Sequence, residues 1–127
     1  MPESETTMNI RVMKSITEIV AGDGVLLREL CNPNTQNDFT GRYSLASASL
    51  AAGKSSRPHR LASHELYFIL GGVGVMHIED EAEQVSVGYA IEIPPGSRQW
   101  LENTSEGPLT FLCIVDPGWR KEDETIL

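Results

Sequence analysis

The sequence contains only two cysteines and no long apolar run. Cys31 and Cys113 form neither a disulfide framework nor a CxxC pair, so we expect two reduced thiols, with Cys113 packed as a small buried hydrophobe. A membrane-spanning helix needs about 20 apolar residues, which no stretch of the chain supplies. The start, MPESETTMNI, lacks the basic and apolar regions of a signal peptide. We therefore expect a cytoplasmic protein with no membrane partner.

Basic residues are also scarce. Ten lysines and arginines stand against 18 acidic residues, which gives a formal net charge of −8. This balance argues against a nucleic-acid partner, because binding to phosphate backbones needs clustered positive charge. No phosphate loop, dinucleotide fingerprint or GxSxG elbow is present, so we expect no nucleotide cofactor and identify no catalytic nucleophile.

What the chain does contain is a succession of short strand patterns separated by turn residues. A length of 127 residues suits one domain. Alternating or β-branched runs end at glycine, proline and acidic clusters, and residues 32–41 indicate a loop. This pattern predicts an all-β protein with a jelly-roll barrel. The predicted strands are 25–31, 42–50, 65–70, 73–79, 84–87, 90–93, 99–103 and 109–115.

Two stretches carry a family resemblance. GKSSRPHRLASHELYFILGG and GYAIEIPPGSRQWLEN follow each other in the middle of the chain. Their glycines, prolines and polar residues fall in the register of the two cupin motifs, so the chain resembles the cupin superfamily. The positions that carry the first motif are Gly53, His59, Leu61, Glu65 and Gly72, and those that carry the second are Gly88, Pro94, Gly96, Gln99 and Asn103.

The resemblance implies a double-stranded β-helix, that is, a small jelly-roll barrel with a cavity, and a chain that pairs into a homodimer. Strand patterns extend it over most of the chain, which we divide within one domain. Residues 1–40 are expected to form an N-terminal extension packing on the barrel, residues 41–117 the barrel, and residues 118–127 a tail in which Trp119 anchors on the barrel wall. Residues 1–7 are expected to be disordered, residues 8–13 an edge strand, and residues 15–20 a helical turn, whereas regular structure ends at Pro117-Gly118.

The resemblance also implies a divalent transition metal, Zn, Mn, Fe or Ni, held by three histidines and a glutamate. Two of those histidine positions hold Leu61 and Gln99 here. His59 and Glu65 are good ligands for such metals, whereas the amide oxygen of Gln99 is a weaker one. The candidate metal ligands are therefore His59, Glu65 and Gln99.

Other residues near the two motifs are expected around the cavity: Leu61, His64, Tyr67, Arg98 and Cys113. His64 faces inward only if its strand starts irregularly, because side chains alternate along a strand. Arg98 at the cavity mouth would attract an anionic ligand, although exposed arginines are common.

Two hypotheses follow. In the first, the protein binds a small polar or carboxylated ligand through a divalent metal, and His59 or Glu65 moves a proton if the protein is an enzyme. In the second, His59, Glu65 and Gln99 hold a small molecule without a metal and without catalysis, in a binding or sensing module. The sequence leaves both open.

Overall fold

The structure is a computed structural model, and it describes residues 8–127. The disorder expected for residues 1–7 lies outside this range. Across residues 8–127, no helix has the length and apolar character that a membrane crossing requires. The described elements are η1 (Met13–Ser15), β1 (Ile19–Val20), β2 (Leu26–Cys31), β3 (Ser44–Leu50), β4 (His59–Leu61), β5 (His64–Gly71), β6 (Val73–Ile78), β7 (Glu81–Ser86), β8 (Ala90–Ile93), β9 (Gln99–Asn103), β10 (Leu109–Asp116), η2 (Lys121–Asp123) and β11 (Glu124–Ile126).

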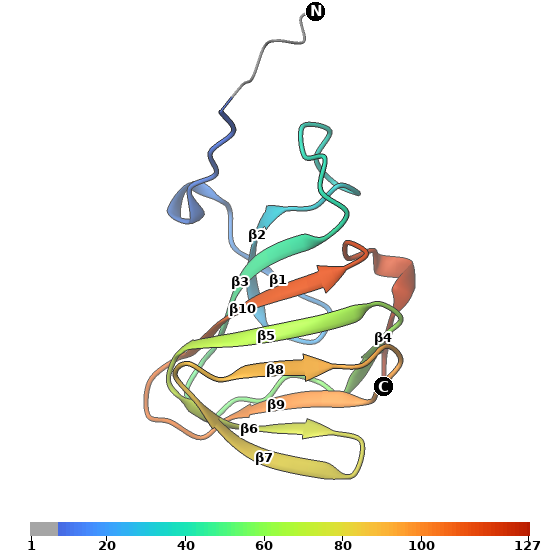
Figure 1. Cartoon of the computed structure of the whole chain (residues 1–127). Coiled ribbons are helices and arrows are strands. Elements are labelled where there is room, and N and C mark those ends of the chain that lie inside the picture. Colours follow the sequence, from blue (N-terminus) through green and yellow to red (C-terminus); the bar gives the residue numbers. More distant parts are fainter. Residues whose placement is uncertain (1–7) are drawn as a thin grey trace, which may run out of the picture.

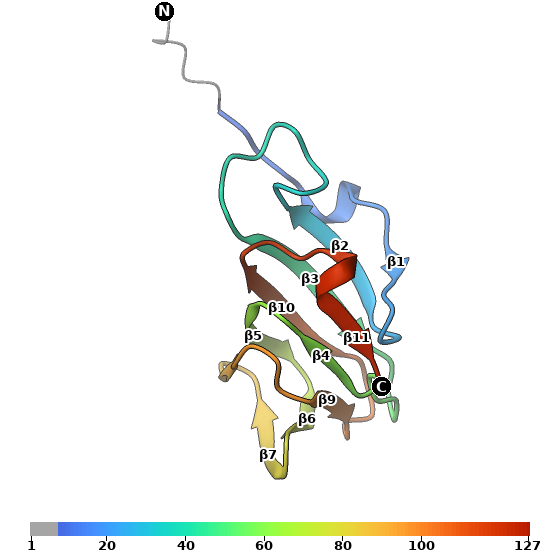
Figure 2. The same ribbon diagram turned by 90° about the vertical axis from the view of Figure 1, so that its right-hand side faces the viewer.

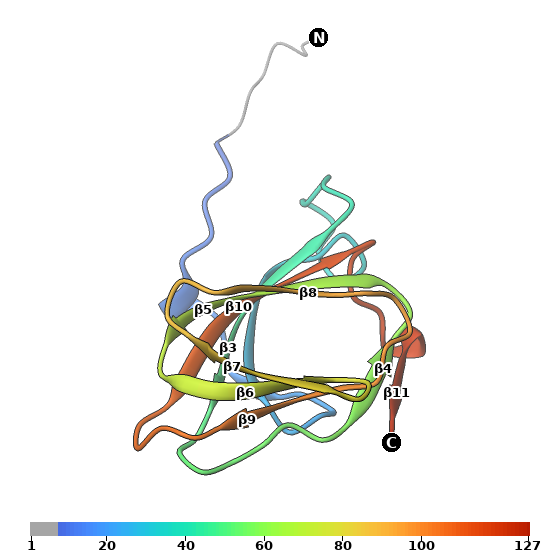
Figure 3. The same cartoon turned by 60° about the horizontal axis from the view of Figure 1, so that its bottom comes forward.

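The strands form two antiparallel sheets that face each other and enclose a barrel (Figures 1 and 3). One sheet has the order β1-β2-β3-β10-β5-β8, and the other has the order β11-β4-β9-β6-β7. In the first sheet, Cys113 of β10 lies between Ala46 of β3 and Tyr67 of β5. In the second, His59 of β4 pairs with Gln99 of β9. The predicted all-β barrel is confirmed, and these registers bring both motifs to its inside.

Side-chain alternation fills the barrel interior. Along β3 and β9 every second residue is buried, as expected for strands with one face on a core. Ile69, Leu109 and Phe111 are among the most deeply buried apolar side chains, with at most 2% of their surface exposed. Replacement of a buried phenylalanine by alanine costs about 3–5 kcal/mol of folding stability. This cluster therefore stabilises the barrel that contains the cavity.

Gly72 shows why a motif glycine is needed at its position. Its φ is 90°, in the left-handed region that favours glycine. A Cβ atom there would lie 2.9 Å from the carbonyl oxygen of Pro108. The β5–β6 turn therefore packs directly on the chain that enters β10.

The N-terminal part differs from its prediction in detail. Residues 8–12 form no strand, and the helical turn lies earlier than expected, at Met13–Ser15, with no side-chain cap. Ile19 and Val20 instead pair with Leu27 and Leu26. The capping pattern was misleading, because β-branched residues beside a free strand edge gain more from pairing than from one helical turn.

Regular structure also continues past Pro117-Gly118, contrary to the prediction. Residues 124–126 form β11, which pairs with β4 at the edge of the second sheet (Figure 2). β1 and β2 likewise belong to the first sheet, because β2 pairs with β3. Both ends of the described chain therefore contribute strands next to the barrel opening.

Candidate functional site

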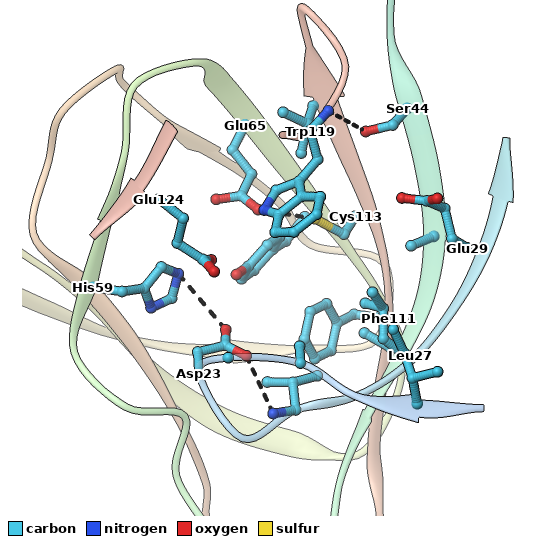
Figure 4. A pocket seen from close by; sticks show the side chains of 18 of the residues that line it. Asp23, Leu27, Glu29, Ser44, His59, Glu65, Phe111, Cys113, Trp119 and Glu124 are labelled. Carbon is cyan, nitrogen blue, oxygen red and sulfur yellow. Dashed lines mark hydrogen bonds and ion pairs between the residues drawn. The ribbon is translucent and has the colours of Figure 1, made fainter. Parts of the chain in front are cut away.

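A cavity of about 320 Å³ opens between the two sheets (Figure 4). Much of its wall is apolar and comes from the first sheet and the residue before β2: Val25, Leu27, Ala46, Ala48, Phe111 and Val115. Polar side chains project into it from the motif strands, from the β1–β2 turn and from β11. A mainly apolar hollow with a few convergent polar groups is typical of a small-molecule site.

His59 presents one ring nitrogen to this cavity. It begins β4, and only 2% of its surface is exposed. Its Nδ1 lies 2.8 Å from the carbonyl oxygen of Arg57, which can only accept, so Nδ1 carries the hydrogen. In the neutral ring this leaves Nε2 as an acceptor facing the cavity, 3.7 Å from Oδ2 of Asp23.

Asp23 comes from the turn between β1 and β2, where the sequence reads AGDG. Its Oδ1 accepts a hydrogen bond from the backbone N–H of Val25 at 3.2 Å. The N–H of Arg57 donates to the carbonyl of Asp23 at 2.7 Å, which ties this turn to the segment before β4. Within residues 8–127, Oδ2 receives no hydrogen bond, although the side chain is only 9% exposed.

Glu65 of β5 is the centre of a closed hydrogen-bond network. Gln99 donates to Oε1 at 2.8 Å, and the thiol of Cys113 donates to Oε2 at 2.9 Å. Tyr67 in turn donates from its hydroxyl to Oε1 of Gln99 at 3.2 Å. Both oxygens of Glu65 and both ends of the Gln99 amide are thus engaged with neighbouring side chains.

Burial changes the acidity of this network. Desolvation raises the pKa of Glu65 above its ordinary value of 4.5, against the opposing effect of the hydrogen bonds from Cys113 and Gln99. Desolvation, followed by the nearby Glu65, raises the pKa values of Tyr67 and Cys113 well above their usual ranges. The thiol and the phenol are therefore neutral hydrogen-bond donors at pH 7.

The C-terminal tail completes the wall. Trp119 lines the cavity, and its backbone N–H donates to Oγ of Ser44 at 3.0 Å. Glu124 projects in from β11 (Figure 4). Burial first, and the neighbouring Asp23 second, raise the pKa of Glu124 above 4.5. A Cβ atom on Gly22 would lie 3.2 Å from Oε1 of Glu124, so the β1–β2 turn and β11 meet here.

The lining of the cavity is acidic. Four carboxyl groups face the cavity, those of Asp23, Glu29, Glu65 and Glu124, and no lysine or arginine does so among the described residues. Glu29 is partly satisfied, since Thr35 and Asn32 donate to its two oxygens. A ligand in this cavity therefore meets an excess of acceptors.

Comparison with known proteins places the fold. A family model described as a cupin domain matches residues 47–115, which is more than half of the chain. The chain belongs to the cupin family. An uncharacterized protein of Methanocaldococcus jannaschii is 35% identical to this cupin over 113 residues, 88% of this chain and 89% of that protein.

Solved structures are similar at lower sequence identity. A Cupin 2 conserved barrel domain protein from Salinispora arenicola has a TM-score of 0.75 and 16% identity, with 92% of each chain covered. A variant of Streptomyces Pac13, solved with uridine, has a TM-score of 0.76 and 18% identity, over 96% of this cupin and 92% of that chain. Pac13 is described as a nucleoside dehydratase. At these identities the likeness extends to the fold.

The residues predicted from the sequence separate into two groups. His59, Glu65, Tyr67 and Cys113 line the cavity, and Gln99 lies behind Glu65 and Tyr67 with 1% of its surface exposed. Three others do not line it. Leu61 is buried away from the cavity wall.

The structure corrects the expectation that His64 and Arg98 lie at the cavity. The strand is regular at His64, so its ring points outward and lies 2.7 Å from Glu92. Arg98 stacks on the ring of Trp100, with 4.6 Å between the guanidinium carbon and the ring centre. Neither is available to an anionic ligand in the cavity.

Sequence reasoning missed Asp23, Glu124 and the inward position of Trp119. Asp23 lies in the sequence AGDG, which indicated only the end of an element. Nothing in the neighbouring residues predicts that Asp23 is buried. Glu124 lies in a charged tail, although its alternation with Ile126 was a weak strand signal. Both depend on contacts between distant parts of the chain.

The donor set of this cupin does not fit the metal ion that the family resemblance implies. Glu65 has both oxygens occupied by hydrogen bonds from Gln99 and Cys113. Gln99 uses its amide oxygen to accept from Tyr67, and Leu61 offers no donor atom. Among residues 8–127, no three His, Cys, Asp or Glu side chains form a group suited to hold a metal. His59 alone keeps a free ligand atom from the expected set.

Proposed function

We propose that this cupin binds a small organic molecule in its cavity without a metal ion. The observation that carries the proposal is the closed network around Glu65, in which hydrogen-bond donors take the place of a cation. A buried polar network of this kind is stable when all its members are paired, as they are here. Of the two hypotheses left open by the sequence, the metal-free one agrees better with these contacts.

The cavity suits a compact ligand with an apolar body. Its volume of about 320 Å³ lies at the small end of ligand sites. The rings of Tyr67 and Phe111 pack with their centres 4.7 Å apart and form an aromatic wall. A Pac13 variant of similar fold was solved with uridine, which supports a small organic molecule as the kind of ligand. A carboxylated ligand is disfavoured, because the lining is acidic and none of its described residues is a lysine or arginine.

Benzyl alcohol, a neutral aromatic probe, tests this function. We expect it to shift the backbone amide signals of cavity residues such as Phe111 and Val115 in NMR titrations of the tag-free protein. The binding should survive a chelator. Ala46→Leu, which fills the cavity from β3, should weaken it while the remaining spectrum stays folded. A lack of shifts at the cavity, or binding that requires Zn, Mn, Fe or Ni, would contradict the proposal.

We further infer that this protein pairs with a second copy through the outer face of the first sheet. Alternate residues there are apolar: Ile114 lies between Leu45 and Leu66, and Leu112 lies beside Phe68. Phe68 is 38% exposed although it is a large aromatic side chain. A contiguous apolar face of this kind marks an interaction surface.

Charge placement favours a second copy as the occupant. Arg28 lies on β2 near one edge of this face, and its Nε is buried without a hydrogen-bond partner among the described residues. Glu92 lies on β8 at the other edge. A twofold axis near β10 would bring Glu92 of one copy toward the guanidinium group of Arg28 of the other, so that opposite charges would face each other across the interface.

Light scattering after size-exclusion chromatography tests the assembly. We expect the mass of a dimer for the wild type and the mass of a monomer for Phe68→Glu or Leu112→Glu. Val87→Glu, at an apolar position that is 62% exposed and lies outside this face, is the matched control and should stay dimeric. A monomeric wild type would contradict the inference.

A further inference from the structure

Asp23 and His59 lie side by side at the cavity, with 3.7 Å between Oδ2 and Nε2 (Figure 4). We propose that the ligand of this cupin carries a cationic nitrogen, an ammonium or amidinium group, that donates to both. This inference rests on the proposed metal-free cavity and names the chemistry of its ligand.

The two facing atoms are both acceptors. Nδ1 of His59 is committed as a donor to the Arg57 carbonyl, so Nε2 of the neutral ring has a lone pair. Oδ2 of Asp23 receives no hydrogen bond from the described residues, and its side chain is more than nine-tenths buried. Their separation of 3.7 Å is longer than a hydrogen bond. Oδ2 of Asp23 faces the cavity, so a cationic donor on the ligand would form a charge-assisted hydrogen bond with it.

The surroundings favour a charged donor over a neutral one. The carboxyl groups of Glu65 and Glu124 also line this part of the cavity. No lysine or arginine among the described lining residues competes for them. A cation is therefore attracted and an anion repelled, and burial strengthens both effects because the local dielectric constant is low.

The opposite wall suits the remainder of such a ligand. Phe111, Tyr67 and Trp119 supply aromatic surface within the same cavity. Aromatic faces stabilise apolar groups by burial and cationic groups by their quadrupole. An arylalkyl or alkyl amine, with one charged end and one apolar end, matches this arrangement.

Three probes of one shape test the inference: benzylamine, benzyl alcohol and benzoate. At neutral pH they carry a positive, a zero and a negative charge. We expect NMR titrations to give an affinity about tenfold or more higher for benzylamine than for benzyl alcohol, with benzoate the weakest, since a partly buried ion pair contributes more than a kilocalorie per mole. Equal or stronger binding of benzoate would overturn the inference.

Binding of benzyl alcohol tests the proposed function separately from this inference. If benzyl alcohol binds and benzylamine binds no tighter, the cationic ligand is wrong and the metal-free cavity stands. If none of the three shifts cavity signals, both are wrong. Asp23→Asn keeps the acceptor for Val25 and removes the charge, so it should abolish the preference for benzylamine over benzyl alcohol. Glu124→Gln should reduce it, and Glu83→Gln, an exposed change on β7, should leave it intact.

The state of the His59 ring provides a measurement that does not depend on any probe. Its two ring nitrogens have distinct ¹⁵N shifts in each tautomer. We expect hydrogen on Nδ1 in the free protein, because Nδ1 lies 2.8 Å from the carbonyl oxygen of Arg57. Hydrogen on Nε2 would instead direct a donor at Asp23 and satisfy it internally, which would overturn the proposal.

Discussion

His59 and Gln99 are directly paired across β4 and β9, yet their side chains serve different neighbours. His59 turns Nε2 toward Asp23, whereas Gln99 donates to Glu65. In the resemblance to metal-binding cupins, both positions would be histidines that share one ion. Here the two side chains come from paired positions but belong to separate sets of contacts.

Restoring the two missing histidines should create a metal site. Gln99→His combined with Leu61→His removes a donor to Glu65 and adds two imidazoles beside His59. We expect affinity for Ni or Mn to rise about tenfold to a hundredfold over the wild type, measured by isothermal titration calorimetry. Unchanged affinity in a folded double variant would mean that these positions do not converge.

Removal of the Gln99 amide should destabilise the fold. Gln99→Leu leaves the Tyr67 hydroxyl and Oε1 of Glu65 without their partners in a buried setting. We expect a loss of about 1–3 kcal/mol in the free energy of unfolding, measured by urea denaturation. The change Glu83→Gln on exposed β7 serves as a control and should have little effect. A loss no larger than the control's would show that water replaces the amide.

Stability should depend on pH through Glu124. Its folded-state pKa lies above the ordinary 4.5, so the folded protein holds this proton more tightly than the unfolded chain. The free energy of unfolding should therefore fall as pH rises from about 4.5 through the folded-state pKa. Glu124→Gln should flatten this fall and stabilise the protein at neutral pH. An unchanged pH profile would contradict the assignment.

Cys113 should be a slow nucleophile. Burial and the adjacent Glu65 raise the pKa of its thiol, and the thiolate is the reactive species. We expect iodoacetamide to modify Cys113 far more slowly than free cysteine at pH 7.5, with mass spectrometry of peptides as the readout. Glu65→Gln should accelerate the reaction. Cys31, which is also buried, provides an internal reference.

The sequence predicted the central strands, because glycine turns fix the hairpins and alternation fixes the faces. The resemblance to the cupin motifs implied that His59, Glu65 and Gln99 approach one another. The sequence could not predict that Cys113 donates to Glu65, since that contact depends on the pairing of β10 with β5.

The positions of Asp23 and Glu124 could not be predicted from the sequence for a different reason. Asp23 and Glu124 are 101 positions apart in the sequence, and their shared cavity exists only because β1 and β11 take edge positions in the two sheets. Local patterns say little about which edge a two-residue or three-residue strand will join. His64 shows the opposite case: simple alternation placed it outside, and the structure agrees with alternation.

The meeting of Gly22 and Glu124 has a consequence for how this barrel can diversify. The barrel's interior packing comes mostly from the middle of the chain, whereas two of the acceptors proposed to bind the ligand, Asp23 and Glu124, lie beside or within the short edge strands β1 and β11. Short edge strands tolerate substitution better than a packed interior does. Changes confined to the β1–β2 turn and β11 would alter the proposed charge preference while the scaffold stays the same.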